Sequence, residues 1–291
     1  MANSSSPESV AAMDHTQRYR AGTPLTPPQT TLPEPWTKIT KTKDLMQGLW
    51  VGDRLPTMQQ ISIASFLANG HEFHLYTYSK LSNVPDGTVI RDAAEIIPRS
   101  QVFLNTKLNT FAAFSDFFRY KLLLDRGSWW VDLDMVCLRP FLFDSEYVFS
   151  SELDLGHERT NCGVIKAPMG SELMAYTWDV CQKKDKQNLT WDEVGPDLME
   201  KAVKRFGLVR HVQPANTFCV LPYFFWYAVL QPRCFRFEAN TFAIHLWYEL
   251  WRRRNISVDA EYDPRCLYEQ FKTKFLLQKT IDPRHNAYQV M

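Results

Sequence analysis

The sequence predicts an α/β domain with a mostly parallel central sheet flanked by helices. Short apolar runs alternate along the chain with longer segments that have helical spacing. Hydrophobic residues make up 45% of the sequence and aromatic residues 14%, which is typical of a well-packed globule. A chain of 291 residues can bury a large core within one such domain. We therefore expect parallel strands joined by right-handed helical crossovers.

The expected elements follow one another in a regular order. They are strand 46–51, helix 56–69, strand 72–78, a short strand near 89–90, helix 108–125, strand 129–135, strands near 147–150 and 162–167, and helices at about 171–186 and 192–206. In helix 108–125, apolar or small residues recur at helical spacing, and Gly127 stops the helix before the next strand. An aromatic region at 223–227 and a helical C-terminus complete the domain.

The strand expected at 129–135 carries two carboxylates. The apolar run 129–131 leads into Asp132 and Asp134, with one residue between them. Because side chains alternate along a strand, we expect both aspartates on the same side. Two like charges this close are unfavourable without a cation, and carboxylate oxygens suit a hard divalent ion. On its own, however, an Asp-x-Asp more often marks a strand end with two solvated acids.

The helix before this strand carries an acid–base pair. Asp116 and Arg119 are three residues apart and therefore neighbours on one helix face. An ordinary surface ion pair would stabilise the helix by only about 0.3 kcal/mol. Apolar residues surround the pair on most sides, so we expect a partly buried site instead. Such a helix brings its side chains to the carboxyl edge of a parallel sheet.

This block resembles a known family. The sugar-binding DXD region of retaining glycosyltransferases is similar to a block of this chain formed by Ser115-Asp116-x-x-Arg119, a leucine run, Gly127 and Asp132-x-Asp134. The relatives are yeast-type α-mannosyltransferases, α-1,4-galactosyltransferases, bacterial capsule and lipooligosaccharide glycosyltransferases and, more remotely, clostridial glucosylating toxins. Ser128 stands where this group usually has a second glycine. The resemblance covers roughly 45–251 and implies a glycosyltransferase-A fold with a single Rossmann-like domain.

The resemblance implies a metal-dependent retaining glycosyltransferase of polysaccharide biosynthesis. Such an enzyme would transfer a hexose, most often UDP-linked, from a nucleotide sugar to a glycan, glycolipid or other acceptor. Asp134, with Asp132 directly or through water, would hold Mn²⁺ or Mg²⁺ against the diphosphate. His245, in a His-x-Trp segment similar to the family's, would be a further ligand. A lone histidine is, however, more often structural.

The same resemblance implies the groups that bind the nucleotide-sugar donor. Asp116 and Arg119 would hydrogen-bond hydroxyls of the donor sugar, with Arg119 also near the diphosphate. Trp50, at the end of the first expected strand, would stack on the base, although a core tryptophan is nearly as good an interpretation. No nucleophile stands out, so retention would follow from attack on the side of the leaving diphosphate.

Three alternatives remain open at this point. Residues 132–136 also satisfy the haloacid-dehalogenase phosphatase signature, although that motif normally opens its domain and here a long folded segment precedes it. A second alternative is a nucleotide-sugar-binding relative that has lost turnover. A third is a peripheral membrane contact through the aromatic and basic segment 247–254, for which packing at the active site is the competing interpretation.

Charge and cysteine usage exclude other classes. The formal net charge is +1, so there is no global electrostatic case for nucleic acid as a partner. The six cysteines show neither zinc-ligand spacing nor a secreted disulfide framework.

The first part of the chain differs in composition from the rest. Residues 1–42 are rich in Pro, Ser and Thr and are expected to be disordered, and 43–291 to form the catalytic domain. No apolar stretch in the tail resembles a signal peptide or membrane anchor. We expect a cytoplasmic bacterial enzyme, with the inner face of the membrane as a second expected location. A Golgi ectodomain is the alternative, with which sequons at Asn188 and Asn255 are compatible.

Overall fold

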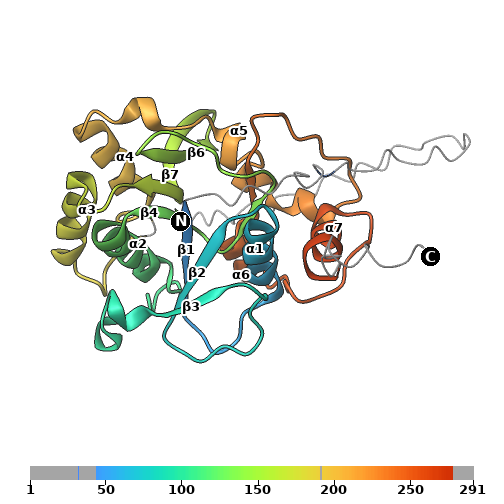
Figure 1. Ribbon diagram of the computed structural model, residues 1–291, viewed down its shortest axis with the longest axis horizontal. Coiled ribbons are helices and arrows are strands. Elements are labelled where there is room, and N and C mark those ends of the chain that lie inside the picture. Colours follow the sequence, from blue (N-terminus) through green and yellow to red (C-terminus); the bar gives the residue numbers. More distant parts are fainter. Residues whose placement is uncertain (1–31, 33–43, 191, 278–291) are drawn as a thin grey trace, which may run out of the picture.

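A computed structural model describes residues 32, 44–190 and 192–277 of the chain (Figure 1). The predicted disordered tail, 1–42, lies outside the described residues except for Leu32. The helices are α1 Thr57–Ala68, α2 Ala112–Arg126, α3 Glu172–Gln182, α4 Pro196–Arg205, α5 Ala215–Phe218, α6 Tyr248–Arg253 and α7 Leu267–Lys272. The strands are β1 Leu45–Trp50, β2 Glu72–Thr77, β3 Val89–Asp92, β4 Ser128–Val131, β5 Met135–Cys137, β6 Val148–Asp154, β7 His157–Ala167 and β8 Ala243–His245.

The central sheet has six strands in the order β3-β2-β1-β4-β7-β6. The first four run parallel to one another, whereas β7 is antiparallel to both of its neighbours, β4 and β6. The predicted α/β class with a mostly parallel sheet is therefore confirmed. Strands β6 and β7 form a hairpin, and the strand expected near 162–167 therefore begins earlier, at His157.

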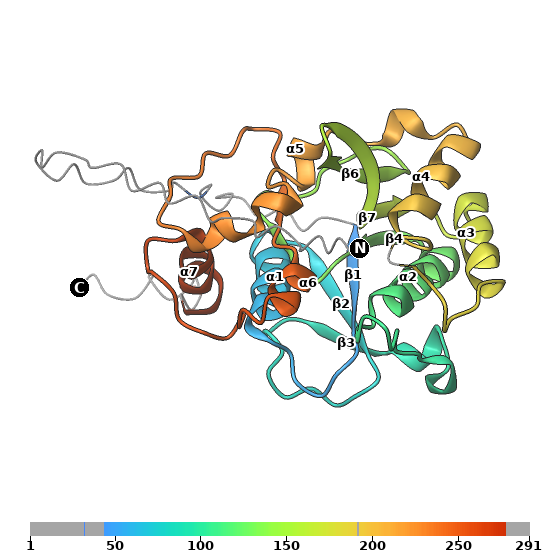
Figure 2. The ribbon, with the colours of Figure 1, turned by 180° about the vertical axis from the view of Figure 1, so that it is seen from behind.

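Helices cover both faces of the sheet (Figures 1 and 2). Helices α2, α3 and α4 lie together on one side, and α1 lies on the other side near α6 and α7. Strand β4 supplies large side chains to both layers. Trp130 is buried in the core under α2, whereas Trp129 is buried in the core near α1. A strand that is buried on both faces requires such a continuous apolar run.

Strand β4 ends earlier than the sequence predicts. It stops at Val131, and residues 132–134 form a turn rather than the end of a strand. The amide of Met135 donates to the carbonyl of Asp132 at 3.0 Å, which closes the turn. Strand β5 then leaves the main sheet and pairs antiparallel with β8 in a separate two-stranded sheet. The two aspartates do lie close together, as expected, but a turn brings them there and not the alternation of side chains along a strand.

Two further boundaries differ from expectation. Helix α2 begins at Ala112 rather than at residue 108, because Asn105 and Thr110 pair with each other just before it. The aromatic region expected at 223–227 forms a 3₁₀-helix, Tyr223–Leu230. Shorter 3₁₀-helices are Ala93–Glu95, Arg99–Gln101 and Val209–His211, and a π-helical turn, Thr273–Leu277, follows α7.

Candidate functional site

The turn after β4 is fixed by backbone hydrogen bonds to two distant segments. The amide of Asp132 donates to the carbonyl of Gly163 on β7 at 2.8 Å. The amide of Leu246 donates to the carbonyl of Asp134 at 2.9 Å, and Met135 stands opposite His245 in the β5–β8 pair. This pairing carries the imidazole of His245 to the turn, although it lies more than a hundred positions further along the chain.

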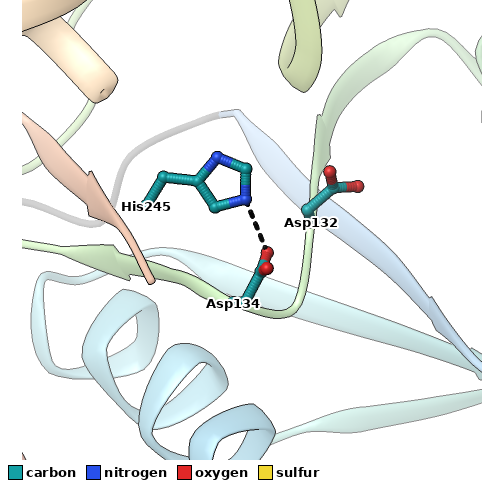
Figure 3. Close-up of side chains that lie close together, drawn as sticks. All are labelled: Asp132, Asp134 and His245. Carbon is teal, nitrogen blue, oxygen red and sulfur yellow. Dashed lines mark ion pairs between the residues drawn. The ribbon is translucent and has the colours of Figure 1, made fainter. Parts of the chain in front are cut away.

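Asp132, Asp134 and His245 lie close together, with the ring of His245 directed at Asp134 (Figure 3). One potential ligand atom from each residue lies within 4.8 Å of those of the other two. The Nε2 atom of His245 is 3.1 Å from Oδ1 of Asp134, and the aspartates are partly exposed whereas the histidine is buried. The three side chains therefore form a compact cluster of two carboxylates and one imidazole.

The cluster shifts the pKa values of its members in opposite directions. Burial alone would lower the pKa of His245, but the Asp134 carboxylate outweighs it and raises that pKa well above its ordinary value. Burial would raise the pKa of Asp134, yet His245 and the backbone amide of Tyr248 lower it overall. The pKa of Asp132 is raised, because burial and the nearby Asp134 outweigh the effect of Arg119.

The segment from β8 to α6 shapes one wall of the cluster. The ring of Trp247 stacks on that of His245, with centroids 3.8 Å apart. Trp247 has φ 58°, a left-handed conformation that is costly for a bulky residue. This turn aims the backbone amide of Tyr248 at Oδ2 of Asp134, to which it donates at 2.8 Å. The left-handed conformation of Trp247 thus places its own indole against His245 and the amide of Tyr248 against Asp134.

Arg119 connects the helix α2 to the other aspartate. Its Nη2 donates to Oδ1 of Asp132 at 2.9 Å, and its Nη1 donates to the carbonyl of Cys162 at 2.7 Å. Nη1 also lies 3.3 Å from Oδ1 of Asp116. The indole Nε1 of Trp130 donates to the same Oδ1 of Asp132 at 2.9 Å. The guanidinium is therefore a structural centre that joins α2, β7 and the turn.

The Asp116–Arg119 pair is buried, as the sequence analysis expected. The two residues are 7% and 5% exposed, which rules out a surface ion pair. Burial raises the pKa of Asp116 to about 7, with Arg119 opposing the shift and Asp132 adding to it. Gly195 lies against this carboxyl, since a Cβ there would come within 3.1 Å of Oδ2. Asp116 is thus poised between its charged and neutral forms near neutral pH.

Trp50 lies at the end of β1 and is half-buried. Its Nε1 donates to the carbonyl of Arg54 at 2.9 Å, which fixes the indole against the loop after β1. Its ring meets that of Tyr248 edge-on, with centroids 6.2 Å apart. Tyr248, whose backbone amide donates to Asp134, therefore links Trp50 to the cluster. The structure brings Trp50 to the same side of the domain as the cluster, but partly covered.

Sequence reasoning missed two contributors to this site. Trp130 stands two positions before Asp132, so strand alternation is a signal that could have placed its indole on the same side. The backbone amide of Tyr248 has no such signal, because its position depends on the left-handed conformation of Trp247.

The aromatic and basic segment 247–254 packs into the domain. Trp251 is fully buried and donates from Nε1 to the carbonyl of Leu246 at 2.8 Å. Trp247 donates in the same way to Leu221. Both tryptophans of this segment therefore serve packing at the site, which was the competing interpretation to a lipid contact. Within the part of the chain that the structure describes, no helix is long and apolar enough to cross a bilayer.

Comparison with known proteins defines the class. Residues 57–153 match the family model described as "Glycosyltransferase sugar-binding region containing DXD motif". The matched region lies within the α/β fold and contains the Asp-x-Asp turn, so this part of the chain is similar to the sugar-binding region of DXD-containing glycosyltransferases. The matched region includes Asp116, Arg119, Asp132 and Asp134. This match favours the glycosyltransferase interpretation over the phosphatase alternative.

Distant similarities to solved structures accompany this match. One is "PaToxG Glycosyltransferase", with TM-score 0.41 and 16% identity over 56% of this chain and 69% of the other. Another, described as "Structure of Transferase", has TM-score 0.38 and 10% identity over 70% and 92%. The apo-form glycosyltransferase GlyE of Streptococcus pneumoniae TIGR4 has TM-score 0.32 and 12% identity over 60% and 46%. No curated protein matches the sequence.

Proposed function

We propose that the chain is a metal-dependent retaining glycosyltransferase that transfers a hexose from a nucleotide sugar, with UDP-hexose favoured, to a glycan or glycolipid acceptor. The single observation that supports this most is the convergence of Asp132, Asp134 and His245 within 4.8 Å. The DXD aspartates alone would be consistent with a solvated strand end. A buried imidazole brought to them from a distant strand points to a ligand set.

The donor atoms of this cluster fit a divalent metal ion. Carboxylate oxygens suit Mg²⁺ and Mn²⁺, and an imidazole nitrogen favours the softer Mn²⁺ of the two. Binding requires a neutral imidazole, so His245 would release its proton. Its contact with Asp134 would then be replaced by a bond from the imidazole nitrogen to the ion. Such an ion, when bound, would offset the charge that develops on the leaving diphosphate. We therefore favour Mn²⁺, with Mg²⁺ as the alternative.

The donor sugar is assigned to the helix α2. Both terminal nitrogens of Arg119 already have protein partners, and its buried Nε has no hydrogen-bond partner among the described residues. Its main role in this proposal is to position Asp132, with Nε left for a donor oxygen. Asp116, whose pKa is about 7, would hydrogen-bond a sugar hydroxyl as acceptor or donor. Trp50 is proposed to stack on the base.

Other parts of the proposal rest on the sequence resemblance. They are retention of anomeric configuration, a role in polysaccharide biosynthesis, and the assignment of 43–291 as one catalytic domain. A cytoplasmic bacterial location, at the inner face of the membrane or away from it, remains a prediction from the sequence alone.

A donor screen tests the proposal. The full chain would be incubated with UDP- and GDP-linked hexoses, with Mn²⁺, with Mg²⁺ or with EDTA, and free nucleoside diphosphate would be measured. We expect hydrolysis of one donor that requires metal and is abolished by EDTA. Full activity in EDTA would overturn the metal assignment. Metal-dependent binding of a donor, with neither hydrolysis nor transfer, would instead favour the inactive binding relative.

A further inference from the structure

A row of aromatic rings leads from the candidate metal cluster to the protein surface. It begins at Trp247, whose ring stacks on His245. Tyr223 meets Trp247 edge-on at 6.2 Å between centroids, and Phe224 meets Tyr223 at 5.3 Å. Phe225 lies 5.0 Å beyond Phe224. We call Trp247, Tyr223, Phe224 and Phe225 the aromatic row.

The outer end of the aromatic row faces solvent. Phe224 is 42% exposed and Phe225 is 49% exposed, although both follow Pro222 in a short 3₁₀-helix that buries Ala228 and Val229. Exposed phenylalanines side by side are unfavourable in water and commonly mark a binding surface. Because the row is continuous with the cluster where a donor would lie, its natural occupant is the second substrate.

Carboxylates flank the inner part of the aromatic row. The hydroxyl of Tyr223 donates to Oδ1 of Asp154 at 3.0 Å. Arg159, next to Asp154 on the β6–β7 hairpin, forms ion pairs with four carboxylates, those of Glu152, Asp154, Asp192 and Asp197. One guanidinium cannot neutralise four carboxylates, so this neighbourhood is negative. It repels phosphates and the headgroups of anionic lipids.

We propose that the aromatic row is the acceptor subsite and that it binds a neutral, hydroxyl-rich glycan. This inference rests on the proposed function, because only a glycosyltransferase needs an acceptor beside the donor. Aromatic faces carry partial negative charge and pack against the C–H faces of sugar rings. Carboxylates such as Asp154 accept strong hydrogen bonds from hydroxyl groups. The two chemistries together suit a sugar better than either a lipid tail or an anionic acceptor.

The test compares the double variant Phe224→Ala/Phe225→Ala with wild type. Lactose, maltose and methyl α-mannopyranoside serve as probe acceptors, and their binding is followed by saturation-transfer NMR. We expect binding of at least one probe to wild type and loss of that signal in the variant. With the active donor, the ratio of transfer to acceptor-free hydrolysis should fall roughly tenfold, which corresponds to about 1.4 kcal/mol.

Two control variants accompany the double variant. Met169→Ala removes another exposed side chain at the far end of β4, next to Gly127, and should leave probe binding unchanged. Phe225→Trp, with Phe224 intact, keeps an aromatic ring at this position and should keep probe binding. Thermal unfolding of each variant confirms that the surface changes leave the fold in place.

The outcomes separate the two proposals. If wild type binds no probe, or if the double variant binds and transfers normally, the acceptor assignment is overturned while donor hydrolysis still supports the enzyme. If the double variant instead loses binding to vesicles containing phosphatidylglycerol and keeps sugar binding, the row is a lipid contact. If no donor is hydrolysed, the proposed function fails, whatever the sugars do.

Discussion

The two aspartates of the Asp-x-Asp turn are one residue apart but belong to different parts of the molecule. Asp132 is held by the sheet and α2, through Arg119 and the indole of Trp130. Asp134 is held by the C-terminal segment, through His245 and the amide of Tyr248. Their pKa values move in opposite directions as a result. The comparison indicates that Asp132 anchors the turn, whereas Asp134 is the carboxylate that a metal ion can most readily take over.

The largest expected effect comes from Asp134→Asn. This change removes a metal ligand, so metal-dependent donor hydrolysis should fall roughly a hundredfold or more. The amide oxygen can still accept from Tyr248, and we expect little change in thermal unfolding. Asp179→Asn, in an exposed ion pair on α3, is the matched control and should keep activity. Near-normal hydrolysis by Asp134→Asn would show that Asp134 is not the carboxylate that binds the metal ion.

Arg119→Met should have the largest effect on stability. It leaves the buried carboxylates of Asp116 and Asp132 without their cation, a change that costs about 3–5 kcal/mol. Urea unfolding measures the loss, and Lys183→Met, which removes an exposed cation, should change it by less than about 0.5 kcal/mol. Asp132→Asn should be much milder than Arg119→Met. Equal stability of Arg119→Met and wild type would show that Asp132 is not anchored in this way.

His245→Gln tests the other side of the turn. We expect Mn²⁺ affinity, measured by isothermal titration calorimetry, to weaken roughly tenfold or more, because even groups that only orient a metal ligand contribute this much. Asp134→Asn should weaken it further, since a charged ligand is lost. If His245→Gln binds Mn²⁺ as tightly as wild type, the histidine is structural, as a lone histidine usually is.

The smallest expected effects lie at the opposite end of β4. Ser128 has φ 72°, where glycine is easier, and its hydroxyl bridges the amide and carbonyl of Leu45 at 3.1 and 2.8 Å. Ser128→Ala should destabilise by about 1–2 kcal/mol, because it loses both hydrogen bonds and keeps the strained Cβ. Ser128→Gly should lie within about 1 kcal/mol of wild type. Both variants should keep donor hydrolysis. A loss of hydrolysis would show that the Asp-x-Asp turn depends on the opposite end of β4.

Local patterns were enough to predict much of the fold. The apolar run before the motif predicted a strand, and β4 forms there with Trp129 and Trp130 buried in different cores. The spacing of Asp116 and Arg119 among apolar residues indicated a partly buried pair, and the structure buries both residues. Both predictions depend only on neighbours in the sequence, where helical and strand periodicity apply.

The turn at 132–134 could not be predicted in the same way. Strand β4 ends at Val131 because β5 pairs with β8 and diverges from the main sheet. That pairing joins segments more than a hundred residues apart, and no local pattern specifies it. His245 entered the analysis through the family resemblance, and the amide of Tyr248 did not enter at all. Contacts between distant segments therefore set the details of the site that periodicity left open.

The dependence of Asp134 on the C-terminal segment limits how this protein can be divided. The region that matches the family model, 57–153, holds both aspartates but neither His245 nor the second strand of the β5–β8 sheet. A fragment that ends before β8 would retain the recognisable motif and lose the imidazole of His245, the indole of Trp247 and the amide of Tyr248. A fragment for truncation, fusion or domain exchange must therefore include β8 and α6, because the motif alone does not form the complete site.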